Sequence, residues 1–204
     1  MLDNDIITKE EKEIFDDVLD NIRSRFTYDE DSGPAVPFIK YALLQDYSGI
    51  IPYKTVKVQS PGGVCCLSLV KVQYSYTSGK HGTGIGSYLQ AYVFIELPKA
   101  FGHTIIKRET IMNKIMELFQ PLEIDFEDDR DFSREFYVLA KDKDKARELM
   151  TRRFRDAVRE IKGADPYIEC LNDYMLVTNK RGVADDSLNS LIGFGIRISS
   201  LAPF

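Results

Sequence analysis

One stretch decides the fold of this chain: Phe132-Ser-Arg-Glu-Phe136-Tyr-Val138-Leu-Ala-Lys-Asp142-Lys-Asp-Lys-Ala146-Arg147-Glu-Leu149-Met150. Its first part has the pattern of a strand, and a lysine/aspartate turn follows. Apolar residues then recur at helical spacing, which predicts one long amphipathic helix. The buried stripe of that helix consists of Ala146, Leu149, Met150, Phe154, Ala157, Val158 and Ile161. Asp142 or Asp144 is expected to cap its start and Gly163 to end it.

A second main helix is expected over residues 8–26. Thr8 and Glu11 form a capping box ahead of an apolar stripe at helical spacing. Shorter helices are expected over residues 38–47 and 110–119.

The remaining apolar patterns predict strands. The run over 64–76 changes phase at Leu69-Val70, which indicates a β-bulge. Asn172-Asp173 is the expected turn of a hairpin over 167–177. Further strands are expected around Val56 and Val58, over 88–97, 101–106 and 122–126, and in a closing strand from Ile192 to Ile198 whose free edge could pair with another chain.

Together these elements predict an α+β fold: a mostly antiparallel sheet of about seven or eight strands covered by two main helices. The chain has 204 residues, 44% of them hydrophobic, which is enough for a sizeable core. No linker separates two cores, so we expect a single domain over 1–204.

Charge and cysteine usage exclude several classes. A formal charge of −5 argues against general nucleic-acid binding, which needs a basic face. The acidic N-terminus does not resemble a signal peptide, and no apolar run is long enough to span a bilayer, so we expect a cytoplasmic protein without membrane insertion. Cys65, Cys66 and Cys170 are too few and too poorly spaced for a metal or disulfide framework, and we interpret them as buried apolar residues.

The strongest candidate site is the glycine-rich stretch over 79–87. Backbone N–H groups of such a loop can bind an anion, and the candidate ligand-binding residues are Lys80, His81, Gly82, Gly84 and Gly86. A strand follows instead of a helix, and neither the P-loop nor the dinucleotide spacing is present. The alternative interpretation is a plain connection between two strands.

Other polar clusters have ordinary structural interpretations. The acidic run over 123–131 lacks the glycine and glutamate of a calcium loop and is interpreted as a turn. The helix face with Glu148, Arg152, Arg155 and Arg159 is expected to be solvated, with the acidic turn as a partner for its remaining charge. His103 is expected at the surface. No pattern predicts a catalytic, metal or cofactor site, and a dyad of Cys65 or Cys66 with His81 has no support from spacing.

The opening stretch resembles a bacterial family known only as a domain of unknown function. The resemblance spans roughly residues 94–180, and it is carried by Phe94-Ile-Glu-Leu97, Phe101-Gly102-His-Thr104, Phe132, Phe136, Val138, Asp142, Ala146, Arg147, Leu149 and Met150. It implies a fold and no reaction. Other members often have N-terminal membrane helices, whereas this chain has a capped, charged helix there.

These observations favour a non-enzymatic binding or protein-interaction module, whose ligand is a protein or a small molecule. One alternative is a small-molecule enzyme that uses the 79–87 loop. Another is a self-associating structural subunit, and thus a homo-oligomer.

Overall fold

The computed structural model describes residues 7–30, 40–45, 47–78, 82–108, 122–179, 182–183 and 187–200. Within that part of the chain, nine strands form one sheet in the order β1-β2-β3-β4-β9-β8-β5-β7-β6. Every neighbouring pair is antiparallel, which confirms the α+β class with a mostly antiparallel sheet. The strands are β1 (Tyr28–Asp29), β2 (Gly49–Val58), β3 (Cys65–Ser78), β4 (Gly82–Glu96), β5 (His103–Arg108), β6 (Leu122–Glu123), β7 (Phe136–Ala140), β8 (Tyr167–Leu171) and β9 (Tyr174–Thr178).

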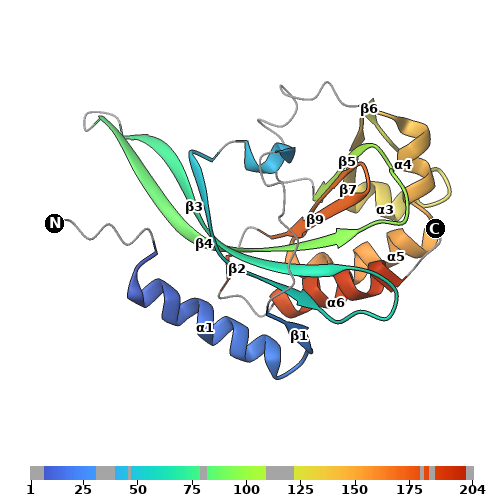
Figure 1. Ribbon diagram of the computed structural model, residues 1–204. Helices are drawn as coiled ribbons and strands as arrows, with labels where there is room; N and C mark the ends of the chain where they lie inside the picture. The colour runs from blue at the N-terminus through green and yellow to red at the C-terminus, as the bar shows by residue number, and fades with distance from the viewer. Residues whose placement is uncertain are drawn as a thin grey trace.

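Helices cover one face of this sheet, which we call the helix face (Figure 1). Its central strands contribute Cys65, Leu67 and Val93 to a core shared with buried residues of the helices. The α-helices that contribute to it are α1 (Lys9–Arg23), α3 (Arg130–Glu135), α4 (Lys143–Leu149), α5 (Arg152–Glu160) and α6 (Ser187–Ser200). The prediction that two main helices cover the sheet is therefore wrong, because the helical layer is divided among more and shorter elements.

The opposite face, which we call the second face, carries Cys66, Val70, Tyr92 and Phe94. Among the described residues, the short 3-10 helix η2 (Ala42–Leu44) packs on this face. It lies in the region where the sequence predicted a helix over 38–47. The central strands are thus apolar on both faces over part of their length. This explains why the apolar pattern of the sequence changes phase at Leu69-Val70: Leu69 is buried on the helix face and Val70 on the second face. The register between β3 and β4 does not shift there. The register shift lies in β2 instead, between Pro52 and Lys54.

The predicted closing strand over Ile192–Ile198 is wrong, because this segment is helix α6. Strand alternation fitted these residues, but Leu188, Leu191 and Ile192 with Ile198 also follow helical spacing, and that face is buried. Gly195 lets the helix axis approach the sheet, since a Cβ there would lie 2.7 Å from Val93 Cγ1 and 2.8 Å from Cys65 Sγ. Tertiary packing overrides the low helix propensity of the two glycines.

The long helix predicted over Ala146–Ile161 is two helices, α4 and α5. Asp142 caps α4 as predicted, but Thr151 leaves the helical conformation and its hydroxyl accepts from the N–H of Phe154, which starts α5. Phe132 belongs to helix α3 rather than to a strand, and its ring stacks on Phe136 of β7 with ring centroids 5.0 Å apart. Short 3-10 helix η4 (Lys162–Ala164) follows α5 and contains the predicted stop at Gly163.

Two local predictions are confirmed. Thr8 and Glu11 form both hydrogen bonds of the capping box that starts α1. The hairpin of β8 and β9 turns at Asn172-Asp173, where Asn172 has φ of 58°. The helix predicted over 110–119 lies outside the described residues.

We expect the two glycines of α6 to respond in opposite directions to alanine. A Cβ at Gly193 meets nothing within 4 Å, so Gly193→Ala should raise the free energy of unfolding by about 0.5–1 kcal/mol. Gly195→Ala should lower it by about 1–3 kcal/mol, because the new methyl group overlaps core side chains. Urea unfolding followed by far-UV circular dichroism measures both. Equal effects of the two substitutions would contradict the close contact between α6 and the sheet.

Candidate functional site

The most prominent surface feature is a two-stranded arm, which we define as residues 74–78 of β3 and 82–88 of β4. Pairing between β3 and β4 runs without interruption from Cys65↔Ile95 to Ser78↔Gly82. The neighbouring described strands stop earlier, since β2 pairs with β3 only as far as Gln73 and β9 pairs with β4 only from Val93. The arm therefore extends past the rest of the sheet, as Figure 1 shows at the upper left.

The glycines of the arm make room for tyrosine rings on the opposite strand. Tyr74 pairs with Gly86 and Tyr76 pairs with Gly84. A Cβ at Gly86 would lie 2.5 Å from Tyr74 Cζ, and one at Gly84 would lie 2.7 Å from Tyr76 Cζ. Each ring thus lies across the glycine opposite it, a packing that supports a strand where glycine alone would weaken it.

The candidate ligand-binding residues are therefore placed as follows. Gly82, Gly84 and Gly86 belong to β4, and Gly82 begins that strand with φ of 84°. Lys80 and His81 lie outside the described residues. The structure accounts for Gly84 and Gly86 by ring packing, while an anion-binding role of this stretch stays a prediction.

A row of tyrosines runs from the body of the protein onto the arm. The hydroxyl groups of Tyr47 and Tyr88 form a hydrogen bond with an O–O distance of 2.7 Å. The ring centroid of Tyr74 lies 6.0 Å from that of Tyr88 and 6.2 Å from that of Tyr76. All four rings lie on the second face, and we call Tyr47, Tyr74, Tyr76 and Tyr88 the tyrosine row. Its outer members are exposed, Tyr74 by 39% and Tyr76 by 48%.

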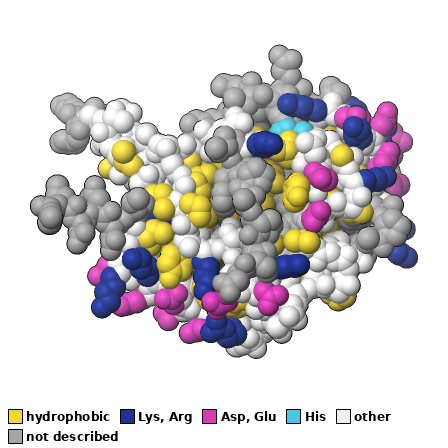
Figure 2. Space-filling view, viewed as in Figure 1, with side chains coloured by type: hydrophobic (Ala, Val, Ile, Leu, Met, Phe, Trp, Pro, Cys, Tyr) yellow, Lys and Arg dark blue, Asp and Glu magenta, His cyan; other side chains and the backbone are white. Residues whose placement is uncertain are grey.

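The arm differs from the rest of the surface in charge. Charged residues make up 29% of the chain, yet Lys80 is the one Asp, Glu, Lys or Arg between Lys71 and Glu96 in the sequence. Figure 2 shows charged side chains gathered along α1 and around α4, while the projecting part at the upper left is hydrophobic or neutral. The cores of protein–protein interfaces are likewise depleted in charged residues and enriched in tyrosine, so the composition of the arm resembles theirs.

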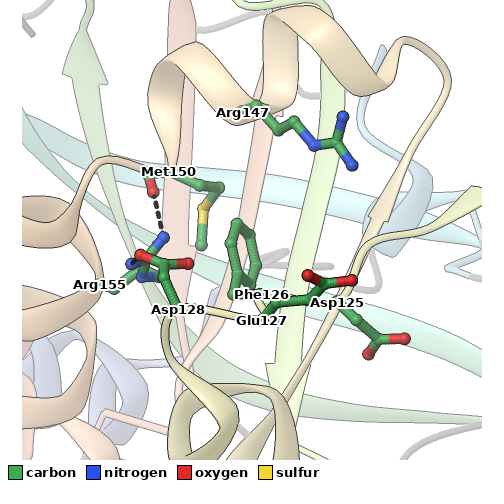
Figure 3. Close-up of a pocket in the computed structure, with 7 residues that line it drawn as sticks. All are labelled: Asp125, Phe126, Glu127, Asp128, Arg147, Met150 and Arg155. Atoms are coloured by element: carbon green, nitrogen blue, oxygen red, sulfur yellow. Dashed lines mark hydrogen bonds and ion pairs between the residues drawn. The ribbon is translucent and has the colours of Figure 1, made fainter.

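A second candidate is a cleft of about 390 Å³ beside α4. It is lined by Asp125, Phe126, Glu127, Asp128, Arg147, Met150 and Arg155. Figure 3 shows Arg147 on α4 across a gap from Phe126. None of the described arm residues borders this cleft.

The charges at the base of the cleft neutralise one another. Arg155 is only 5% exposed, and it donates to Asp128, to Asp129 and to the carbonyl oxygen of Met150 at 3.0 Å. Arg159 also donates to Asp129. The predicted solvated face is therefore wrong for Arg155, whereas the acidic turn is confirmed as its partner. This network ties the turn to α5, so we interpret it as structural.

A buried carboxylate on the second face holds η2 in place. Glu169 is 0% exposed and accepts from the backbone N–H of Ala42 at 2.7 Å and of Leu43 at 3.1 Å. Its Oε1 also lies 2.6 Å from Nε2 of His103, and the Tyr167 hydroxyl donates to Oε2 at 3.2 Å. The predicted surface position of His103 is wrong, because β5 and β8 pair side by side and bring it against Glu169.

The described residues contain no cluster of three or more His, Cys, Asp or Glu side chains suited to a metal. The three cysteines are free and buried, as predicted, and Cys65 and Cys66 lie on opposite faces of the sheet. Burial raises the pKa of Cys65 to about 12 and also raises the pKa values of Cys66 and Cys170. These thiols are therefore poorly suited as nucleophiles, and His81, the proposed dyad partner, lies outside the described residues.

Comparison with known proteins adds a fold relationship. The sequence matches no family model, and no curated protein has significant similarity to it. Among solved structures, the chain is similar to the mycobacterial trehalose monomycolate transport factor A, TtfA, with a TM-score of 0.59 and 11% sequence identity. The match covers 91% of this chain and 90% of TtfA, so the two share a fold over nearly their whole lengths. None of the described helices is long and apolar enough to cross a membrane.

The network at the base of the cleft should control acid stability. Burial acts to raise the pKa of Asp129, but hydrogen bonds from Arg159, Phe132 and Arg155 outweigh it and hold that pKa below its ordinary value. The resulting stabilisation is present above the unfolded pKa of about 4 and is lost as pH falls through the lower folded pKa. Asp129→Asn should lower the free energy of unfolding by about 1–3 kcal/mol at pH 7 and flatten its dependence on pH below about 4.

Urea unfolding at a series of pH values measures this effect. The control is Asp131→Asn, because Asp131 is 87% exposed and pairs only with the exposed Arg134 within the described contacts. An unchanged pH slope in Asp129→Asn would contradict the assignment.

Glu169 should matter for the attachment of η2. Glu169→Gln keeps the volume of the side chain but turns one accepting oxygen into a donor that faces a backbone N–H, and it should lower the free energy of unfolding by about 1–3 kcal/mol. The control Glu148→Gln should change it by less than about 0.5 kcal/mol, because its ion pair with Lys99 is exposed. Chemical denaturation tests both, and equal values would show that Glu169 is not an anchor.

Proposed function

We propose that this protein is a non-enzymatic binding module that docks a partner protein on the tyrosine row of its arm. The observation that carries the proposal is the combination of exposed tyrosines with an absence of charge along the described arm. Tyrosine, serine and glycine are enriched in the binding loops of antibodies, where tyrosine offers amphipathic contact area and the small residues adapt around it.

The arrangement of the arm supports such a role. Tyr74 and Tyr76 lie across glycines and contact each other, so they lose little side-chain freedom when a partner covers them. Tyr88 links them to Tyr47 in the body, which gives the row a fixed base. A partner therefore meets a largely pre-arranged surface.

The same packing favours docking over an anion site at Gly84 and Gly86. An anion bound by backbone N–H groups must approach glycine closely. Tyrosine rings occupy one side of Gly84 and Gly86, at distances that leave no room for even a methyl group. The structurally similar protein TtfA is named as a transport factor, and at 11% identity it contributes a shared fold to this proposal and no substrate.

Site-specific photo-crosslinking in the native cells tests the proposal. A benzoylphenylalanine in place of Tyr76 should give a discrete adduct with one protein. The same probe in place of Ile14, which is 42% exposed on α1, should not give that adduct. Adducts shared by both positions would contradict docking on the arm.

The captured protein, once purified, should bind the full chain directly. Tyr74→Ser and Tyr76→Ser should each weaken that binding by about tenfold or more, as expected for exposed aromatic anchors. Ile14→Ser serves as the control and should leave the affinity unchanged. Isothermal titration calorimetry measures it, and circular dichroism verifies that each variant keeps its sheet. Unchanged affinity in both tyrosine variants would overturn the proposed function.

A further inference from the structure

We infer that the arm also pairs with a second copy of this chain, edge to edge along β4, with Ile85 at the two-fold axis. This inference rests on the proposed function of the arm as a docking element, and it identifies one of its partners. It places two tyrosine rows on one continuous surface.

The edge of β4 within the arm has backbone groups available for pairing. The Thr178 hydroxyl donates to the carbonyl oxygen of Ala91, so Ala91 directs its backbone groups away from β3. Backbone direction alternates along an antiparallel strand. Thr83, Ile85 and Ser87 therefore also direct their N–H and C=O groups away from β3. No described strand pairs with them there, and all three residues are exposed.

The edge lacks the features with which proteins prevent strand addition. Such edges usually carry charges, proline or a bulge. Residues 82–88 include no charged residue and no proline, and their register with β3 is continuous. Ile85 is instead 70% exposed, the most exposed large hydrophobic side chain among the described residues.

The sequence of this edge is complementary to itself. Two identical antiparallel edges centred on Ile85 place Ile85 against its copy, and Thr83 of each chain against Ser87 of the other. Like charges directly opposite each other destabilise a strand pair, and a self-paired edge brings every charge near its equivalent. Although the chain has a net charge of −5, this edge has none, so pairing with a second copy brings no like charges together.

The symmetry of the pair determines what it displays. Antiparallel neighbours in a sheet are related by a two-fold axis perpendicular to the sheet, so the same face of both copies points to the same side. Gly86 of one copy then faces Gly84 of the other, so Tyr74 of each copy meets Tyr76 of the other over the shared edge. The dimer presents a doubled tyrosine surface, and the exposed Ile85 becomes buried on the other side.

Sedimentation equilibrium tests the inference with the purified full chain. Over about a hundredfold range of concentration, the average mass should rise from one chain toward two, because dimerisation follows mass action. Ile85→Lys should abolish this rise, since it places like charges at the axis of the dimer. Ile14→Lys adds the same charge at an exposed position of α1 and should leave the rise intact.

Cysteine crosslinking tests the register. In this register Ile85 exchanges backbone hydrogen bonds with its copy, and residues paired in this way have Cα atoms about 5.5 Å apart, which suits a disulfide. With diamide as oxidant, Ile85→Cys should form a covalent dimer by itself, whereas Thr83→Cys and Ser87→Cys should form one only when the two proteins are mixed. The three native cysteines are buried and should not interfere.

The outcomes separate this inference from the proposed function. The edge pairing is overturned if the wild-type chain stays monomeric at every concentration and the Ile85→Cys variant forms no covalent dimer. An adduct from position 76 to another protein would still support the proposed function. A dimer that persists in Ile85→Lys would show association through another surface and would equally overturn the inference.

Discussion

The pairing of β3 with β4 is the interaction on which the rest of the structure depends. It joins two strands of 14 and 15 residues in one register, from the centre of the sheet to the end of the arm. Where β2 and β9 flank the pair, its side chains enter the cores on both faces. Beyond them the same pair continues with two strands alone, and a two-stranded ribbon is marginally stable in water. The fold therefore needs a local source of stability in the arm, separate from its core.

Tyrosine and glycine supply that stability together. Tyr74 and Tyr76 lie across Gly86 and Gly84, and their rings cover the glycine backbone on one face of the ribbon. The arrangement leaves the outer side of each ring in solvent, so what stabilises the arm also makes it a recognition surface. Tyr74 and Tyr76 can therefore both stabilise the arm and contact a partner.

The sequence predicted the parts of the fold that local chemistry determines. A capping box and a turn at Asn172-Asp173 depend on residues a few positions apart, and both are confirmed. Residues 192–198 fitted two periodicities, and the helix buries one of its faces against the rest of the protein, with Gly195 close to Val93 and Cys65. The acidic turn was predicted as a partner for the arginine face, but the burial of Arg155 against Asp129 was not. The contact of His103 with Glu169 joins residues distant in sequence, and no local pattern indicates it. The tyrosine row has a sequence signal in Tyr-x-Tyr over 74–76 and Gly-x-Gly over 84–86, but the predicted connection over 79–87 included these glycines and so hid their pairing.

The arm is connected to the core by a chain of specific contacts. Glu169, buried among apolar side chains, accepts hydrogen bonds from the start of η2. A few residues further along, Tyr47 contacts Tyr88 through its hydroxyl and its ring. A buried carboxylate is retained only when its hydrogen bonds are satisfied, so the position of η2 is tightly determined. Contacts with the interior of the domain thereby fix the base of the tyrosine row, and the core determines where the recognition surface lies.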